Sequence, residues 1–433
     1  MMTYSEAMAY IDSVEWKGSR PGLERITELC RLLGDPQKEL RFIHIAGTNG
    51  KGSVSAMLDS ILRAAGYRVG LFTSPYIERF SDRIRFGGED IPDEELARAA
   101  EQVKRCADAM ADGPTAFELI TAIALVYFRR AGCDLVVWEV GLGGRLDSTN
   151  VVDTTVLSVI TGIALDHCAV LGNTTAAIAG EKAGIIKPGV PVLFGEGDDD
   201  AESVIRRTAS ERGCEYTRTD FSAISDIHSD LFGTDFRFGG RAVRIPLVGL
   251  YQTRNTATAL TAVELLRRQG FVISDEAVTR GLTATRWRAR FDVLSREPLV
   301  VYDGAHNPHG VAGALENIRA LLSPLTTDGR VVLVMGVMAD KDHSDMVDAL
   351  APVAAAVVTV RPDSDRSLAA ADLAEEFRRR GVPVTARSTP AEGVAAALPL
   401  AMRAGRPMVC LGSLYMYGEV KEAVRAALQT PET

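Results

Sequence analysis

Hydrophobic and polar positions alternate along the chain in two patterns, one typical of buried strands and the other of helices. In the first half, short apolar runs rich in β-branched residues cover 42–46, 69–72 and 135–140. Between them, residues 53–65 and 117–130 have helical periodicity. Because strands that alternate with helices are typical of a largely parallel sheet, the pattern predicts an α/β fold.

The same alternation begins again after residue 291, which indicates a second α/β domain. Its expected strands and helices cover 299–302, 308–321, 331–335, 343–350, 356–360 and 408–411. The charged, proline-containing sequence at 294–298 precedes this second cycle, so we expect one domain at 1–296 and another at 297–433. Residues 195–244 contain short alternating pieces, which predict a small antiparallel extension at the edge of the first domain.

Composition narrows the possible functions. The chain has 433 residues, which is long for a single core, and its 46% hydrophobic and 24% charged fractions are ordinary for a globular protein. Its 57 Asp and Glu residues outnumber its 48 Lys and Arg residues, and this net charge of -9 opposes binding to nucleic acid. No stretch reaches the roughly 20 apolar residues of a membrane helix, and the start of the chain lacks the features of a signal peptide. We therefore expect a cytoplasmic protein that binds neither nucleic acid nor membrane.

A glycine-rich segment, GTNGKGS at 47–53, follows the first strand directly and opens the next helix. Glycines let backbone N–H groups approach phosphate oxygens, and the helix start adds positive potential. Lys51 could neutralise the β- and γ-phosphates, and Ser53 could offer its hydroxyl to Mg²⁺. A tight structural turn is the alternative, but the strand, lysine, hydroxyl and helix coincide, which favours a nucleotide. The expected ATP contacts in this loop are Asn49, Gly50, Lys51, Gly52 and Ser53.

Glu139 is a candidate metal ligand. It follows the buried strand DLVVW and precedes a glycine turn, so its carboxylate lies at the carboxyl end of a strand, where ligand sites of α/β proteins form. A carboxylate oxygen suits Mg²⁺. The alternative is a structural carboxylate that caps the glycine turn.

The loop AGTNGKGS resembles the ATP loop of the Mur ligase superfamily, and specifically of its folylpolyglutamate synthase and dihydrofolate synthase branch. Further motifs that resemble this family occur in the same order and span nearly the whole chain. They are PGLERI at 21–26, SPYIERFSDRI at 74–84, EVGLGGRLDSTN at 139–150, LDH at 165–167, EKAGIIKPG at 181–189, YDGAHNPHG at 302–310 and LGSLYMYGEV at 411–420. The resemblance implies an N-terminal P-loop ATPase domain of Mur ligase type, which carries the small antiparallel extension, and a C-terminal Rossmann-like domain that binds glutamate.

The resemblance also implies a metal site and a modified lysine. It makes Ser53, Ser74, Glu139 and His167 the protein ligands of two Mg²⁺ ions. From the residues alone, Lys182 would be a solvated helix lysine or a partner of Glu181. In the family, however, this lysine is carbamylated by CO₂ and helps to hold the second ion. Because that reaction needs the neutral amine, burial should lower the pKa of Lys182.

Three segments are expected around the acceptor, a pteroate or folate, because the family places it there. They comprise Ser19, Arg20 and Pro21, then Thr115, Ala116, Phe117 and Glu118, and finally Asp147, Ser148 and Thr149. The ring of Phe117 could stack on a flat heterocycle, and Asp147 could accept its N–H hydrogens. The alternatives are that Phe117 belongs to the core and that Asp147 caps a turn.

The family also implies contacts to the remainder of the nucleotide and to glutamate. Asn255, Arg290 and Asp303 are the expected ATP contacts, and His306 and Ser413 are the expected glutamate contacts. The family pattern before Arg290 has proline and glycine, whereas this chain has Arg288 and Ala289. Of all these residues, we expect Lys51, His167, Lys182 and His306 to be catalytic.

These implications together predict an enzyme that uses ATP to add L-glutamate to tetrahydrofolate and to 7,8-dihydropteroate, through an acyl-phosphate intermediate. One alternative is a Mur-type amide ligase with a different carboxylate acceptor. Another is a nucleotide-binding module or P-loop switch without ligase chemistry, which would leave the second α/β cycle and the EKAG motif unexplained. We expect the enzyme to be a monomer.

Overall fold

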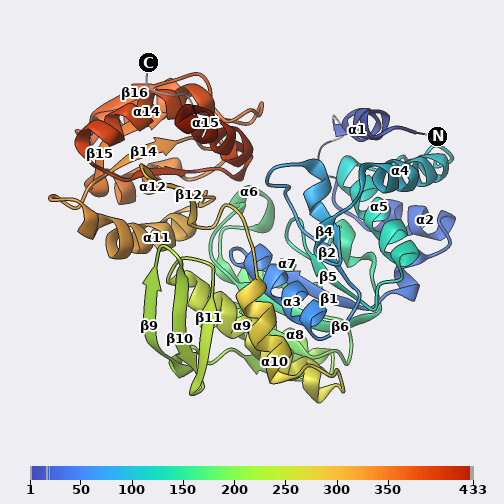
Figure 1. Ribbon diagram of the computed structural model, residues 1–433. Coiled ribbons are helices and arrows are strands. Elements are labelled where there is room, and N and C mark those ends of the chain that lie inside the picture. The colour runs from blue at the N-terminus through green and yellow to red at the C-terminus, as the bar shows by residue number, and fades with distance from the viewer. Residues whose placement is uncertain (1, 16–17, 19, 430–433) are drawn as a thin grey trace. The chain divides into compact units, whose positions relative to one another are not determined.

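The computed structural model describes residues 2–15, 18 and 20–429 (Figure 1). The chain forms two compact units, each of them discontinuous in sequence. Unit 1 comprises Met1–Ser222 and Arg254–Thr285, and unit 2 comprises Ala223–Thr253 and Arg286–Thr433. The chain therefore passes from one unit to the other three times, whereas we expected a single boundary at 296/297.

Unit 1 is built on an eight-stranded sheet with the order β4-β3-β2-β5-β1-β6-β7-β8. Its strands are β1 (Phe42–Ala46), β2 (Val69–Phe72), β3 (Ile84–Phe86), β4 (Glu89–Asp90), β5 (Leu135–Glu139), β6 (Thr155–Gly162), β7 (Val192–Glu196) and β8 (Tyr216–Arg218). All neighbours are parallel except at β2–β3 and β3–β4. Every residue of β1, β2 and β5 is buried, as expected where helices cover both faces of a parallel sheet. The predicted α/β fold is confirmed.

The helices of unit 1 are α1 (Tyr4–Asp12), α2 (Glu24–Leu32), α3 (Lys51–Ala64), α4 (Asp93–Ala107), α5 (Ala116–Ala131), α6 (Cys168–Leu171), α7 (Thr175–Ala183), α8 (Asp199–Glu211) and α10 (Asp275–Ala284), together with most of α9 (Tyr251–Arg268). Two of them, α3 and α5, correspond to the helices predicted at 53–65 and 117–130. Helix α3 begins two residues earlier than expected, because Gly50 takes a left-handed conformation (φ 85°) as its N-cap and lets Lys51 enter the first turn. No described helix is long and apolar enough to cross a membrane.

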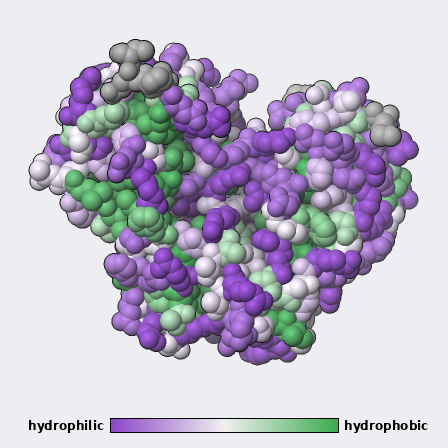
Figure 2. Space-filling model, viewed as in Figure 1, coloured by the Kyte–Doolittle hydropathy of each residue, from purple (hydrophilic) through white to green (hydrophobic). Residues whose placement is uncertain are grey.

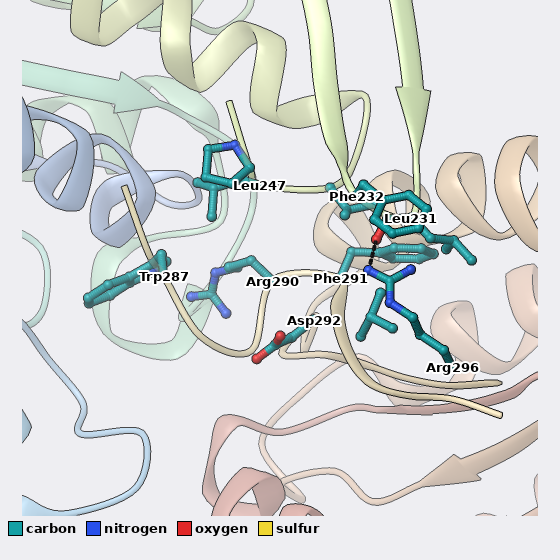
Figure 3. Close-up of a pocket in the computed structure, with 11 residues that line it drawn as sticks. Leu231, Phe232, Leu247, Trp287, Arg290, Phe291, Asp292 and Arg296 are labelled. Atoms are coloured by element: carbon teal, nitrogen blue, oxygen red, sulfur yellow. Dashed lines mark hydrogen bonds between the residues drawn. The ribbon is translucent and has the colours of Figure 1, made fainter. Parts of the chain in front are cut away.

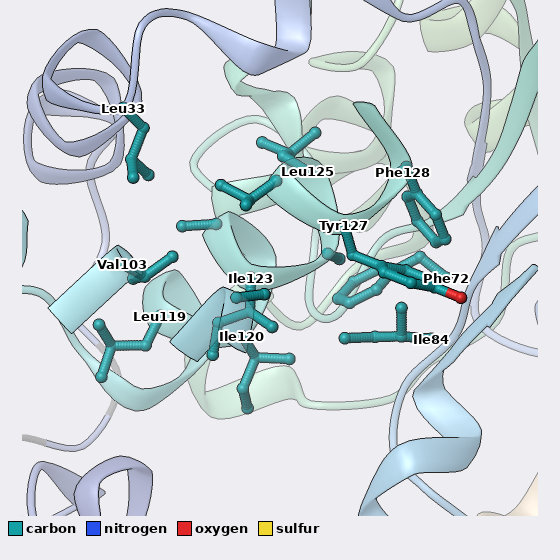
Figure 4. Packing of buried hydrophobic residues seen from close by; sticks show 14 of the residues in the cluster. Leu33, Phe72, Ile84, Val103, Leu119, Ile120, Ile123, Leu125, Tyr127 and Phe128 are labelled. Carbon is teal, nitrogen blue, oxygen red and sulfur yellow. The ribbon is translucent and has the colours of Figure 1, made fainter. Parts of the chain in front are cut away.

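A large core of unit 1 lies where α1, α2, α4 and α5 pack on the sheet (Figure 4). Phe72, Trp138 and Phe42 form its aromatic centre, with ring centroids 4.4 Å apart for Phe72 and Trp138 and 5.4 Å apart for Phe42 and Trp138. Aromatic pairs at these separations add to the stability that burial alone provides. This core supports β2, β5 and β1, the strands whose carboxyl ends carry the expected site.

The small antiparallel sheet predicted at 195–244 is present but shorter. Its strands are β9 (Ile224–Asp230), β10 (Gly233–Phe238) and β11 (Arg241–Ile245). It belongs to unit 2, although we expected it at the edge of the first domain. The reason lies in its contacts: Arg296 donates a hydrogen bond to the carbonyl of Leu231 (3.1 Å) and stacks over the ring of Phe232, 3.8 Å from its centroid.

The rest of unit 2 is a second α/β layer structure. Its six-stranded sheet has the order β12-β13-β17-β14-β15-β16, and only the β12–β13 pair is antiparallel. The strands are β12 (Asp292–Arg296), β13 (Leu299–Asp303), β14 (Val331–Met335), β15 (Ala354–Thr359), β16 (Val384–Ala386) and β17 (Met408–Leu411). The helices are α11 (Pro308–Asn317), α12 (His343–Leu350), α13 (Ala370–Arg379), α14 (Pro390–Ala404) and α15 (Tyr417–Gln429). The helix predicted at 308–321 ends as an α-helix at Asn317 and continues as a π-turn over Ile318–Leu322.

Hydrophilic residues cover much of the face drawn in Figure 2, and the more extensive hydrophobic areas on it lie at the upper left, over unit 2. Apolar atoms contribute a large share of the surface of any globular protein.

Candidate active site

Four adjacent strands of unit 1 bring the expected phosphate and metal residues to one edge of the sheet. The carboxyl ends of β2, β5, β1 and β6 lie side by side in that order. Ser74 follows β2, Glu139 ends β5, the glycine loop follows β1, and His167 comes five residues after the end of β6. Because these strands are parallel, all four positions lie at the same edge, where α/β proteins form their ligand sites.

The glycine loop is held tightly against β6 and α9. The backbone N–H of Thr48 donates to the carbonyl of Gly162 (2.7 Å), and the hydroxyl of Thr161 donates to the carbonyl of Asn49 (2.7 Å). A Cβ added to Gly50 would lie 2.5 Å from Oδ1 of Asn255. The structure therefore brings Asn255, some 200 residues away in sequence, against the loop.

Two lysines from different helices converge on one carbonyl of this loop. Nζ of Lys51 donates to the carbonyls of Gly47 (2.9 Å) and Thr48 (3.2 Å), and Nζ of Lys182 also donates to the carbonyl of Gly47 (2.9 Å). Burial lowers the pKa of Lys182 to about 7, and the positive charge of Lys51 acts in the same direction, while Asp166 and Asp147 oppose it. A large fraction of the Lys182 amine is consequently neutral near neutral pH.

The expected metal ligands differ in their exposure. Ser53 and Glu139 are buried, and Ser74 and His167 are partly exposed. His167 has a left-handed backbone (φ 51°), and its N–H donates to Oδ1 of Asp166 (2.8 Å). Within the described part of the chain, no three His, Cys, Asp or Glu side chains are grouped as a metal site. The expected set contains only two such residues, and its other members are hydroxyls and a lysine.

Phe117 and Asp147, expected beside the acceptor, border the same glycine. A Cβ added to Gly141 would lie 2.5 Å from Cζ of Phe117 and 3.2 Å from Oδ2 of Asp147. Asp147 also caps a short 3₁₀ turn, since its carboxylate accepts hydrogen bonds from the N–H groups of Leu142 (2.8 Å) and Thr149 (3.0 Å). Burial raises the pKa of Asp147 despite these bonds. The hydroxyl of Thr149 donates to the same carboxylate (Oδ1), so the capping alternative is present in the structure.

The other residues expected at the acceptor differ in their burial and in their hydrogen-bond partners. Thr115 and Glu118 form a capping box at the start of α5, in which Glu118 accepts from the N–H of Thr115 (2.7 Å). Phe117 is only partly buried, with its ring centroid 6.1 Å from that of Phe72. Arg20 pairs with Asp112, whereas Ser19 lies outside the described residues. The remaining expected residues are Pro21, which is exposed, Ala116, which is partly buried, and Ser148 and Thr149, which are buried.

In unit 2, Asp303 ends β13 and is held by three donors. Its Oδ2 accepts from the hydroxyl of Tyr251 (2.8 Å) and the N–H of Phe291 (3.0 Å), and its Oδ1 accepts from the N–H of Ala305 (2.8 Å). Burial raises the pKa of Asp303, and the charge of Arg290 opposes this effect. These bonds fix the direction of the carboxylate.

The two residues expected at glutamate follow neighbouring strands of unit 2. His306 follows β13, and Ser413 follows β17, which pairs with β13 in parallel. Nδ1 of His306 lies 2.7 Å from the carbonyl of Gly304, and Oγ of Ser413 accepts from the N–H of Tyr415 (3.2 Å). Both side chains are thereby oriented by nearby backbone groups at the same edge of the sheet.

A pocket of about 220 Å³ in unit 2 is lined by Arg290 and its neighbours (Figure 3). In the figure, the Arg290 side chain lies between Trp287 and Asp292. The residues on either side of Arg290 have left-handed backbones, φ 57° at Ala289 and φ 48° at Phe291. Ala289, where the family pattern has glycine, thus keeps a conformation that glycine adopts without steric cost.

Two residues that support the site were not among the residues expected in it. Thr161 anchors the glycine loop, and Tyr251 orients Asp303. Thr161 occupies the carboxyl end of the strand next to β1, which is the signal that could have identified it. Nothing local in the sequence indicates the partner of Tyr251, because Asp303 is far away along the chain.

Comparison with known families agrees with this geometry. Residues 45–263 match the Mur ligase middle domain, and residues 289–414 match the Mur ligase glutamate ligase domain. A folylpolyglutamate synthase of Lacticaseibacillus casei is 38% identical over 98% of this chain and 99% of its own length. The chain belongs to the folylpolyglutamate synthase and dihydrofolate synthase family. As a member of this family it is an ATP-dependent ligase.

Solved structures of the folylpolyglutamate synthase family share the fold over the full length. The Mycobacterium tuberculosis folylpolyglutamate synthase complexed with ADP and AMPPCP has a TM-score of 0.88, with 28% identity over 99% of this chain and all of that one (100%). A bifunctional folylpolyglutamate synthase/dihydrofolate synthase with Mn, AMPPNP and L-glutamate bound has a TM-score of 0.82. It is 32% identical over 97% of this chain and 98% of that one.

Proposed function

We propose that this enzyme joins L-glutamate to tetrahydrofolate, which lengthens the polyglutamate tail, and to 7,8-dihydropteroate, which makes dihydrofolate. The observation that carries the proposal is the convergence of the glycine loop, Glu139 and Lys182 at one edge of the unit 1 sheet. A solved bifunctional synthase that has a similar fold also supports the proposal. The chemistry requires a carboxylate to be activated and an amine to attack it.

The nucleotide is proposed to bind at 47–53, with Asn49, Gly50, Lys51, Gly52 and Ser53 around its phosphates. The backbone N–H groups at the start of α3 favour anions, and Lys51 adds a positive charge. Lys51 donates to two loop carbonyls, and we expect its ammonium to move to the phosphates when they bind. In unit 2, Arg290 and Asp303 are the proposed further contacts to the nucleotide.

Two Mg²⁺ ions are proposed at Ser53, Ser74, Glu139 and His167, together with Lys182. The donor set fits, because hydroxyl and carboxylate oxygens suit this hard cation, although imidazole is a weaker ligand for it. When bound, the ions would neutralise charge on the phosphoryl group during transfer. Glu139 is buried and ends β5, the strand that pairs with β1, which leads into the glycine loop.

Lys182 is proposed to carry a carbamate formed with CO₂. The amine attacks the carbon of CO₂ and loses a proton, which turns a cation into an anion with two oxygens. A buried lysine whose pKa is lowered to about 7 supplies the neutral amine that this step needs. The modification would also relieve the repulsion between Lys182 and Lys51.

The proposed reaction has two steps. The acceptor carboxylate attacks the γ-phosphorus of ATP, which gives an acyl phosphate and ADP. The amine of glutamate then attacks the acyl carbon and expels phosphate. The chain contributes loop N–H groups and Lys51 at the phosphates, Phe117 and Asp147 at the acceptor, and His306 with Ser413 at glutamate.

The test is phosphate release from ATP in the presence of L-glutamate, with dihydropteroate in one reaction and tetrahydrofolate in another. Mass spectrometry should show one added glutamate on each acceptor. A product from one acceptor alone would restrict the enzyme to that acceptor. If neither gains glutamate while ATP still binds, the folate proposal fails and a Mur-type ligase with another carboxylate acceptor replaces it. Light scattering would test the further proposal that the enzyme is a monomer.

A further inference from the structure

The start of α2 contains an arginine that is almost entirely buried. The side chain of Arg25 is only 10% exposed. A guanidinium does not lose its proton inside a protein, so it must be paired where it is buried. The groups that pair with it therefore determine what this residue does.

Arg25 contacts three groups from two distant segments of unit 1. Its Nε donates to Oε2 of Glu118 (3.1 Å), and its Nη2 donates to the carbonyl of Arg20. Its Nη1 lies 3.7 Å from Oδ2 of Asp112. Asp112 in turn accepts two hydrogen bonds from Arg20, at 2.9 and 3.1 Å. One guanidinium thus ties the loop at 20–22 to the segment at 112–118.

The carboxylate of Glu118, which pairs with Arg25, also stabilises the start of α5. Oε2 of Glu118 also accepts from the N–H and the hydroxyl of Thr115, at 2.7 and 3.0 Å, so the same oxygen holds the first turn of α5. Phe117 lies within that turn and borders Gly141 beside Asp147. Glu118 is itself 2% exposed, so water does not replace the guanidinium as its partner.

We infer that Arg25 is a positioning residue that fixes two walls of the acceptor site, the loop that contains Arg20 and Pro21 and the turn that contains Phe117. The inference rests on the proposed function, which places the pteroate or folate at these segments. Arg25 does not touch the acceptor. It acts by holding the Arg20 carbonyl and the Glu118 carboxylate in one arrangement, and small displacements of such walls weaken binding strongly.

The test compares Arg25→Lys with Arg31→Lys, a control on the exposed side of the same helix. Lysine keeps the positive charge for Glu118 but cannot reach Glu118, Arg20 and Asp112 together. We expect the KM for tetrahydrofolate and dihydropteroate to rise by about tenfold in Arg25→Lys, with kcat and the KM for ATP within about twofold of the wild type. Arg31→Lys should match the wild type.

A second variant guards against misfolding of the first. Asp112 has a half-exposed side chain, so Asp112→Asn keeps the fold and weakens the links of this carboxylate to Arg20 and to Nη1 of Arg25, while the Arg25–Glu118 pair stays. It should raise the acceptor KM in the same direction by a smaller factor. The inference fails if Arg25→Lys has a wild-type acceptor KM, or if the KM for ATP rises equally, which indicates a general structural role. If the wild type itself adds no glutamate, the proposed function fails instead.

Discussion

The chemistry of Lys182 depends on its surroundings more than that of any other residue discussed above. Burial and the nearby Lys51 lower its pKa from 10.5 to about 7, whereas in the unfolded chain it has its ordinary pKa. Between these two values the unfolded chain binds a proton that the folded chain does not bind. The free energy of unfolding therefore increases with pH through this window, and the folded state is penalised below it.

This difference can be measured by comparing the wild type with Lys182→Met in CO₂-depleted buffer. The stability of the wild type should rise relative to that of the variant by about 1.4 kcal/mol per pH unit between pH 7 and pH 10.5. Urea unfolding at several pH values in this range gives both curves. Parallel curves would mean that Lys182 is not desolvated as described. The variant should also lose ligase activity.

Ala289 gives a second prediction at the scale of one residue. It is fully buried with φ 57°, a conformation that costs a non-glycine residue roughly 1–2 kcal/mol. Ala289→Gly removes this cost but adds about 0.5–1 kcal/mol of lost chain entropy, so it should be neutral or slightly stabilising. Ala289→Val should destabilise the fold by more than about 2 kcal/mol, because a β-branched residue is disfavoured there. Thermal unfolding of the two variants tests this order, and the reverse order would contradict the backbone described at Ala289.

At the scale of the elements, helices α3 and α10 pack closely against each other at a glycine of α10, Gly281. A Cβ added to Gly281 in α10 would lie 2.4 Å from Cα of Ile61 in α3, and the obstructing atom is backbone. Helix α3 continues from the glycine loop, so α10 supports the helix that carries this loop.

Gly281→Ala should therefore destabilise the enzyme by about 1–3 kcal/mol and weaken ATP binding. Gly180→Ala is the matched control, because Gly180 is also in a helix, α7, but has nothing within 4 Å of its added Cβ. That change should stabilise the protein by about 0.5–1 kcal/mol. Denaturant unfolding together with nucleotide titration separates the two variants. Equal effects would contradict the tight packing of α3 on α10.

Local patterns predicted most elements but few of the contacts between them. The helix expected at 117–130 and the strand expected at 299–302 correspond to α5 and β13, because both have a plain hydrophobic period. The burial of Lys182 and the approach of Asn255 to Gly50 were not predictable from local patterns, since each depends on residues far away along the chain. The resemblance of the EKAG motif to a family, and not the period of its helix, pointed to Lys182.

At the scale of the whole molecule, the segment 223–253 completes unit 2 although it comes before the end of unit 1. Val248 lies in the hydrophobic core of unit 2, and the N–H of Leu250 donates to Oδ1 of Asn317 (2.8 Å). Tyr251 adds its bond to Asp303. A fragment of residues 286–433 alone would lack all three contacts.

We therefore expect the fragment 286–433 to unfold without a cooperative transition, or at a clearly lower temperature than the full chain. A synthetic peptide of residues 223–253 should restore cooperativity and raise the melting temperature in a concentration-dependent way. Circular dichroism during heating gives both readouts. A peptide with Tyr251→Phe should restore less. If the fragment alone melts cooperatively at a temperature that the peptide does not change, unit 2 does not need this segment.

The threefold passage of the chain also affects how the protein is made. When a ribosome has finished residue 222, unit 1 still lacks α10 and most of α9, which are synthesised only after the small antiparallel sheet of unit 2. At that stage the glycine loop lacks its contact with Asn255, and α3 lacks its contact with Gly281, so part of the packing surface of α3 is uncovered. Folding domain by domain from the N-terminus, which is common for multidomain chains, is not open to this one. Its first unit cannot complete its packing until residue 285 has left the ribosome.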